Sequence, residues 1–177
     1  MYLFSKGHRV LASATLALSL SMVAAPALSQ EKAAATSPAR LWSVTCADAA
    51  SGKGSQCQMV QTLAMKNTGQ RLLTIAVQKQ ETEDHPRLIV GLPHGVFFPG
   101  GVSVAIDEGK KSPVTVQTSD ANGAYATETL DDKMLEALRK GSQLKVEFES
   151  GSREKLEIPV SLKGFAEAYQ RVSSFGG

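Results

Sequence analysis

Short runs of alternating apolar and polar residues dominate the chain from about residue 57 to residue 162, and this alternation constrains the fold more than any other feature. Period two places alternate side chains on one face of a strand. Turn-forming segments such as NTGQ, DANG and ESGS separate the runs. The alternating runs are 88–92, 102–106, 114–116, 144–148 and 156–162, and two further runs, 57–65 and 71–79, carry apolar residues on both faces. Eight or nine short strands at this spacing predict an antiparallel sandwich or barrel, and we take an all-β, antiparallel β-sandwich as the expected fold.

Two segments interrupt the alternation and predict short helices that pack on the sandwich. In LDDKMLEALRKG, Asp131 can cap the first turn, Leu130 and Leu135 can pack across it, and Gly141 can end the helix in a left-handed conformation. The second segment, GFAEAYQRV, has an apolar stripe on one helical face. We expect this stripe to be core, with a ligand groove as the alternative. Its members are Phe165, Ala168, Tyr169 and Val172.

Residues 1–29 have the layout of a cleavable secretory signal. A short basic region, 6–9, precedes an uncharged apolar run, 10–25, which small residues follow. We expect cleavage near Ala27 or Ser29. An uncleaved membrane anchor is the alternative, but the apolar run is shorter than the roughly 20 residues of a spanning helix and serines interrupt it. The chain is therefore expected to be periplasmic or secreted and surface-associated, with no integral membrane span after cleavage.

The net charge that remains after cleavage limits the classes of partner that the chain can bind. Cleavage removes Lys6 and Arg9 and no acidic residue, so the 19 basic side chains become 17 (19 − 2), equal to the 17 acidic ones. A neutral chain lacks the basic surface that displaces counterions from phosphates, so we expect no nucleic-acid partner. Residues 30–40 are small and polar and predict a flexible leader. The remaining residues, 41–177, suffice for a single β-sandwich domain with its own core.

Cys46 and Cys57 are the only cysteines, and ten residues separate them. In an exported protein such a pair most simply forms a structural disulfide. From loop entropy, this disulfide would add about 3 kcal/mol to the free energy of unfolding. A reactive dithiol and a zinc site are the alternatives. The first usually shows a Cys-x-x-Cys spacing and the second needs more nearby ligands than this region offers. Trp42 lies four residues before Cys46, so it should share a strand face with that cysteine and pack beside the bridge in the core.

The order of several motifs makes the chain resemble the invasion-associated locus B family of bacterial exported proteins. After the signal come Trp-x3-Cys, a second cysteine, LPHGVFFPGGVSVAID at 92–107, a hairpin with Gly, the helix LDDKMLEALRKG, and SLKGFAEAY at 161–169. The resemblance covers residues 41 to about 172. It implies a small β-rich periplasmic or surface-associated protein, with members linked to host-cell invasion and no established enzymatic activity.

The chain departs from that family at one place. Members commonly carry a second pair, Cys-x3-Gly-Cys, where this chain has Ser119 and Ala124 around Gly123. Asn122-Gly123 is a strong turn signal by itself, because both residues tolerate a positive φ. We therefore expect the hairpin to close without a covalent clamp and to be looser than in relatives with two bridges.

Outside the signal, any histidine chemistry must use His85 or His94. His85 stands near Glu81, Glu83 and Asp84, which could bind a divalent cation loosely, although a charged run of this kind is more typical of a solvated turn. His94 follows a proline at a turn and lacks any nucleophile motif, so a spatially assembled triad is the only catalytic alternative. We expect no catalytic residue, no metal site and no cofactor.

Phe97 and Phe98 are consecutive, so in a strand one of them must face away from the core. Either a neighbouring loop covers that ring, or it forms an exposed aromatic patch that binds a partner. Phe97, Phe98 and the nearby His94 are therefore the candidate binding surface. An unpaired edge strand of the sandwich could also accept a partner's strand, but the sequence does not identify the edges.

These observations predict an exported, non-catalytic β-sandwich protein that acts through contacts with an unknown protein or envelope partner. A link to host-cell invasion is what the family resemblance implies. A periplasmic structural or chaperone-like factor is the first alternative. A hydrolase built around His94 is the second.

Overall fold

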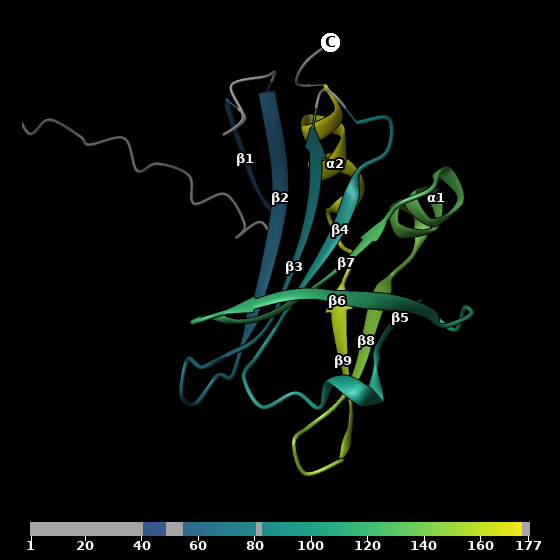
Figure 1. The fold of residues 1–177 in the computed structure, drawn as a ribbon. Helices are drawn as coiled ribbons and strands as arrows, with labels where there is room; N and C mark the ends of the chain where they lie inside the picture. Colours follow the sequence, from purple (N-terminus) through teal and green to yellow (C-terminus); the bar gives the residue numbers. More distant parts are fainter. Residues whose placement is uncertain (1–40, 49–54, 81–82, 175–177) are drawn as a thin grey trace, which may run out of the picture. The chain divides into compact units, whose positions relative to one another are not determined.

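Nine antiparallel strands and two α-helices make up the part of the chain that the structure, a computed structural model, describes: residues 41–48, 55–80 and 83–174 (Figure 1). All of these residues belong to one compact unit. The elements in chain order are β1 (Ser43–Asp48), β2 (Ser55–Ala64), β3 (Arg71–Gln80), β4 (Arg87–Leu92), the 3-10 helix η1 (Phe98–Gly100), β5 (Val102–Ile106), β6 (Ser112–Asp120), β7 (Gly123–Thr129), α1 (Asp132–Lys140), β8 (Gln143–Glu149), β9 (Lys155–Ser161) and α2 (Phe165–Ser173).

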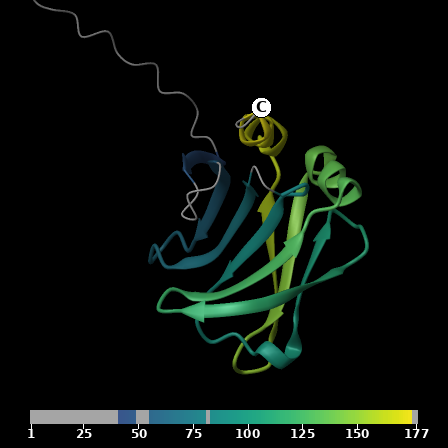
Figure 2. The same ribbon diagram turned by 45° about the horizontal axis from the view of Figure 1, so that its top comes forward.

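The strands pair in the order β1-β2-β3-β4-β7-β6-β5-β8-β9, and every pairing is antiparallel. The sheet curls, so that β2, β3 and β4 lie opposite β5, β8 and β9 (Figure 2). β6 joins the two halves: residues 112–114 pair with β5, and residues 115–120 pair with β7. The expected β-sandwich class is thereby confirmed. The two halves bury one face each against the other, as alternation along the strands requires.

One hydrophobic cluster fills the space between the halves. The apolar positions of the alternating runs supply most of it: Leu88, Val90 and Leu92 on β4 are fully buried, as are Leu144 and Val146 on β8. β3 is an interior strand and buries residues on both faces, as its continuous apolar run predicts. Period two therefore located the core-facing side chains strand by strand.

α2 covers an open side of the sheet. It follows β9 in the chain, but it packs against β1, β2 and β3, and Figure 1 shows it beside the upper ends of these strands. Phe165 meets Trp42 edge to face, with 5.3 Å between ring centroids, and stacks on Tyr169 at 6.3 Å. The four residues of the predicted stripe are all buried, which confirms core rather than groove for α2.

α1 begins as predicted, because the Asp131 carboxylate accepts a hydrogen bond from the Met134 backbone N–H at 2.7 Å. The predicted end of this helix is wrong in detail. Gly141 is extended, at φ −71° and ψ 165°, not left-handed. Only glycine fits at position 141 without a steric clash, since a Cβ would lie 2.6 Å from Cγ2 of Ile106. A close approach of helix end to strand explains this residue, whereas a left-handed cap does not.

The β6–β7 hairpin also differs from its sequence prediction. Asp120 pairs with Gly123, so the turn residues are Ala121 and Asn122, one position earlier than the Asn-Gly signal implies. Gly123 has φ 138° and opens β7, and Asn122 keeps a negative φ. A Cβ on Gly123 would overlap the Leu92 carbonyl oxygen, so this glycine serves the close packing of β7 on β4.

The expected signal at 1–29, its cleavage near Ala27 or Ser29, and the leader at 30–40 lie outside the described residues. Within the described ranges, no helix has both the length and the apolar character needed to cross a membrane.

Candidate binding surface

The loop between β4 and β5 positions the predicted aromatic residues. It forms no strand; a single bridge pairs Val96 with Ser150, and the chain then turns through η1. Two backbone hydrogen bonds hold it against the β8–β9 turn: Phe97 N–H donates to the Glu149 carbonyl at 2.8 Å, and Gly151 N–H donates to the Gly95 carbonyl. The loop is therefore tied to the end of β8 and to the turn that follows it, from Gly95 to Phe97.

The two phenylalanines have different environments. Phe98 is 48% exposed, one of two large hydrophobic residues that are exposed among those described; the other is Leu41. Phe97 is half-buried beneath Arg153, whose guanidinium carbon lies 3.5 Å from the ring centroid. A guanidinium over an aromatic face is a favourable cation–π contact that also covers the ring. Phe97 thus braces the loop, and Phe98 is the side chain that it presents to solvent.

Arg153 is a member of this surface that sequence reasoning missed. It lies in the β8–β9 turn with φ 68°, a left-handed conformation that is uncommon for a residue other than glycine. The segment ESGSRE signals a turn, but nothing in it indicates which loop the arginine meets. Its contact with Phe97 joins positions 56 residues apart (153 − 97), which only the tertiary fold brings together.

His94 is exposed and turns toward a different hairpin. Its Nε2 lies 3.1 Å from the Ala121 carbonyl oxygen in the β6–β7 turn. That contact uses a ring N–H as donor, and the structure records no hydroxyl or thiol partner for His94 among the described residues. His94 therefore ties the β4–β5 loop to the β6–β7 turn at one end, while Arg153 ties it to the β8–β9 turn at the other. We call Phe97, Phe98, His94 and Arg153 the Phe98 surface.

The β6–β7 turn is held by polar contacts where the resemblance implies a bridge in relatives. Asn122 N–H donates to the Asp120 carboxylate at 2.7 Å, and the Arg71 guanidinium donates to the Asn122 carbonyl oxygen. The Asn122 N–H holds the pKa of Asp120 below its usual range, and the Tyr125 hydroxyl acts in the same direction. Several contacts from β3, β4 and the turn itself therefore locate this hairpin.

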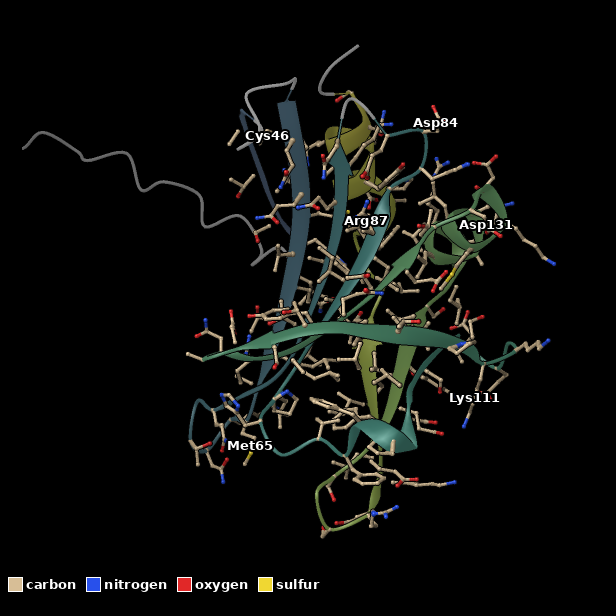
Figure 3. All side chains as sticks on the ribbon, in the orientation of Figure 1. Cys46, Met65, Asp84, Arg87, Lys111 and Asp131 are labelled. Carbon is tan, nitrogen blue, oxygen red and sulfur yellow. A yellow bond between two sulfur atoms is a disulfide. The ribbon has the colours of Figure 1, made fainter. Side chains whose placement is uncertain are left out.

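The cysteines lie at the first edge of the sheet. Cys46 and Cys57 are direct cross-strand partners on β1 and β2, with their Cα atoms 4.1 Å apart and their sulfur atoms at disulfide distance, 2.02 Å. Figure 3 labels Cys46 on the outer strand. Cys57 is buried and Cys46 half-buried. Trp42 is 2% exposed and shares their face, as the parity of β1 predicts.

The acidic cluster around His85 is only partly described, because residue 81 lies outside the described ranges. Glu83 forms an ion pair with Arg87, which Figure 3 labels at the start of β4, and Asp84 and His85 are exposed. No group of three or more potential metal-ligating side chains occurs within residues 41–48, 55–80 and 83–174.

The structure also identifies edges that the sequence left open. β1 and β9 end the sheet, and β6 has a free outer edge along residues 115–120, where β5 has turned away. β9 carries Pro159 and alternating charges, which discourage strand addition. The free part of β6 reads TVQTSD and is uncharged until its last residue. η1 ends two residues before Val102, which pairs with Val114 on β6, the last residue before this free edge.

The fold and these features define an all-β, curled antiparallel sandwich with a cross-strand cysteine pair at its first edge and a braced aromatic loop at one end. The sequence profile of the invasion associated locus B (IalB) protein family matches residues 42–173, and the chain belongs to that family. Among relatives, an invasion protein B homolog from Brucella abortus (strain 2308) is 27% identical over 134 residues, which cover 75% of this chain and 76% of that protein. A homolog from Brucella abortus biovar 1 (strain 9-941) matches with the same figures.

Among solved structures, the crystal structure of invasion associated protein B from Bartonella henselae superimposes with a TM-score of 0.66. The match covers 76% of this chain and 91% of that one at 23% sequence identity, so it shows a shared fold.

Proposed function

We propose that this protein is exported through the signal at residues 1–29 and acts without catalysis, by binding a protein of the bacterial envelope or of a host cell through the Phe98 surface. The observation that carries the proposal is the combination of exposure and bracing at Phe98. A large apolar side chain in water that neighbouring loops hold in place can bind without a large loss of conformational freedom. Aromatic anchors of this kind dominate the binding energy of many interfaces.

Three further features support a binding role. β6 leaves the backbone groups of residues 115–120 free on one edge, and these groups could accept a strand of the partner. His94 offers a polar group at the other end of the same loop. The relatives are named as invasion proteins, which is compatible with a surface that contacts a host component. The cysteine pair supports the other part of the proposal, export, because disulfides persist in oxidising compartments outside the cytosol.

The test is photocrosslinking in living cells. A photoreactive amino acid replaces Phe98 in one strain and Lys163, an exposed residue between β9 and α2, in a control strain. We expect a discrete crosslinked partner from position 98 that is not captured from position 163, and we expect Phe98→Ser to weaken binding of that partner in vitro by at least tenfold while leaving the melting temperature nearly unchanged. Capture of the same proteins from both positions, or of none, would refute this surface as the binding site.

A further inference from the structure

A trough lies on the side of the unit where α1 crosses the end of β5, outside the Phe98 surface. Its volume is about 570 Å³, within the range of small-molecule sites. Met134 and Ala137 line it from α1, and Ala105 and Ile106 line it from β5. Figure 3 labels Asp131 at the start of α1, which marks one end of this region.

The floor of the trough is aliphatic. Ala105 is buried, and Ile106, Met134 and Ala137 are half-buried, so their exposed parts form one apolar lining. No aromatic ring takes part in it. An aromatic ligand would find no stacking partner here, whereas an unbranched alkyl chain would be covered by methyl, methylene and thioether groups.

The rim of the trough carries ammonium groups from two elements: Lys110 from the β5–β6 turn, and Lys133 and Lys140 from α1. Lys140 is paired with Glu136 at 2.7 Å. Lys110 and Lys133 are exposed and form no ion pair with any residue in the described ranges. Two cations therefore stand at the opening without a carboxylate partner.

The acidic residues at the rim are already engaged by backbone donors. Asp107 accepts hydrogen bonds from the backbone N–H groups of Ser142 and Gln143 at 3.1 and 2.9 Å, and Asp131 accepts one from Met134. These carboxylates hold the ends of α1 in place. The lining side chains that remain available to donate to a ligand's anionic group are therefore the lysines and the Ser112 hydroxyl.

The walls of the trough are fixed by the core. Leu138 of α1 is fully buried, and Leu130, directly before the helix cap, is also fully buried. At the other end, the backbone of Gly141 packs so closely on Ile106 that no Cβ fits between them. α1 is thus anchored at both ends, and the trough lies between two elements that the core holds in place.

We propose that this trough binds a free fatty acid, with the alkyl chain along Ala105, Ile106, Met134 and Ala137 and the carboxylate at Lys110 and Lys133. The aliphatic lining selects the chain, and the two unpaired ammonium groups select a terminal anion. A neutral alcohol of the same length should bind more weakly because it gains no charge-assisted hydrogen bond from the lysines. Shortening the chain by two methylenes should weaken binding about tenfold while those groups lie inside the trough.

The experiment is isothermal titration of the purified protein with sodium laurate, below the concentration at which it forms micelles, and with dodecanol as the uncharged comparison. We expect saturable binding of one laurate per chain and binding of dodecanol weaker by tenfold or more. Backbone amide shifts on laurate addition should centre on α1 and β5. Absence of saturable laurate binding would overturn the proposal, and so would equal binding of laurate and dodecanol.

Two variants test the location of the site, and a third variant serves as a matched control. Ala137→Phe fills the trough and should abolish binding; the double variant Lys110→Glu, Lys133→Glu reverses the rim charge and should weaken laurate by at least tenfold with dodecanol unchanged. Lys163→Glu changes one exposed lysine outside the trough and should bind as the parent does. Circular dichroism checks that each variant is folded. Laurate binding that survives in both trough variants, or association only with fatty-acid vesicles, would overturn the assignment.

Discussion

Removing the cysteine pair should cost the fold about 3 kcal/mol. The two cysteines are direct partners on β1 and β2 and lie 11 positions apart in sequence, so the bridge closes a short loop in the unfolded chain. Loop entropy for that length gives about 3 kcal/mol at 25 °C. For a chain of this size, 1 kcal/mol corresponds to about 2–4 °C in melting temperature, so Cys46→Ala with Cys57→Ala should melt about 6–12 °C below the parent.

The location of the bridge predicts where stability is lost first. β1 has one neighbouring strand, β2, and follows directly after Trp42, which belongs to the buried cluster that Cys46 packs against. Because Trp42 is the only tryptophan, its fluorescence reports this edge alone, whereas far-ultraviolet circular dichroism reports the whole sheet. In the double variant, Trp42 emission should shift to longer wavelength at lower temperature than the circular dichroism changes.

The control is reduction. Dithiothreitol should lower the melting temperature of the parent by the same amount and leave the double-alanine variant unchanged. A variant that melts within 2 °C of the parent, or a parent that reductant does not affect, would refute the loop-entropy argument. Free thiols at both positions in protein taken from its native compartment would refute the structural bridge itself.

Three further outcomes follow from single contacts. Ser119 and Ala124 are direct cross-strand partners, so Ser119→Cys with Ala124→Cys should form a bridge under oxidising conditions. The bridge should appear in mass spectrometry as a loss of two hydrogen atoms and should raise stability by about 2 kcal/mol. Asp120 has a lowered pKa, so its stabilising contribution to the hairpin is present above the ordinary pKa and is lost as pH falls through the lowered value. The chemical shift of the Asn122 amide should therefore change with pH below 3.8, and this change should be absent in Asp120→Asn. Phe165→Ala should cost about 3–5 kcal/mol in denaturant unfolding, and a loss under 2 kcal/mol would contradict its place in the core.

The strands were predictable because their signal is local. Period two assigns a face to each residue without reference to any other strand, and Leu88, Val90 and Leu92 are buried together as it requires. The cap of α1 by Asp131 and the buried stripe of α2 follow from local rules in the same way. At Gly141, by contrast, a contact with a distant segment determines the residue, so reasoning from cap preferences placed its conformation wrongly. Gly123 has the positive φ that the turn signal allows, but the turn lies one position earlier than that signal implies.

In the candidate site, too, the features that are local in sequence were predictable, and the features that depend on tertiary contacts were not. Consecutive aromatics in a loop rich in glycine and proline are visible in the sequence, and Phe98 is indeed exposed. The contact of Arg153 with Phe97, the contact of His94 with Ala121, and the free edge of β6 all depend on which loops meet after the sheet has curled. The sequence of one segment does not show which loops meet, because the register and the curl of the sheet depend on many strand pairings together.

The curl has an energetic consequence at the first strand. The sheet begins with β1 and ends with β9, and α2 returns from β9 to pack on β1, β2 and β3. Two tethers therefore hold the same edge: the Cys46–Cys57 pair fixes β1 to β2, and the contact of Phe165 with Trp42 fixes it to α2. Removing either tether leaves β1 held by the other, so combining Cys46→Ala and Cys57→Ala with Phe165→Ala should not give the sum of the separate losses. A coupling free energy of at least 0.5 kcal/mol in a double-mutant cycle is expected, and strict additivity would show that the two tethers act on independent parts of the fold.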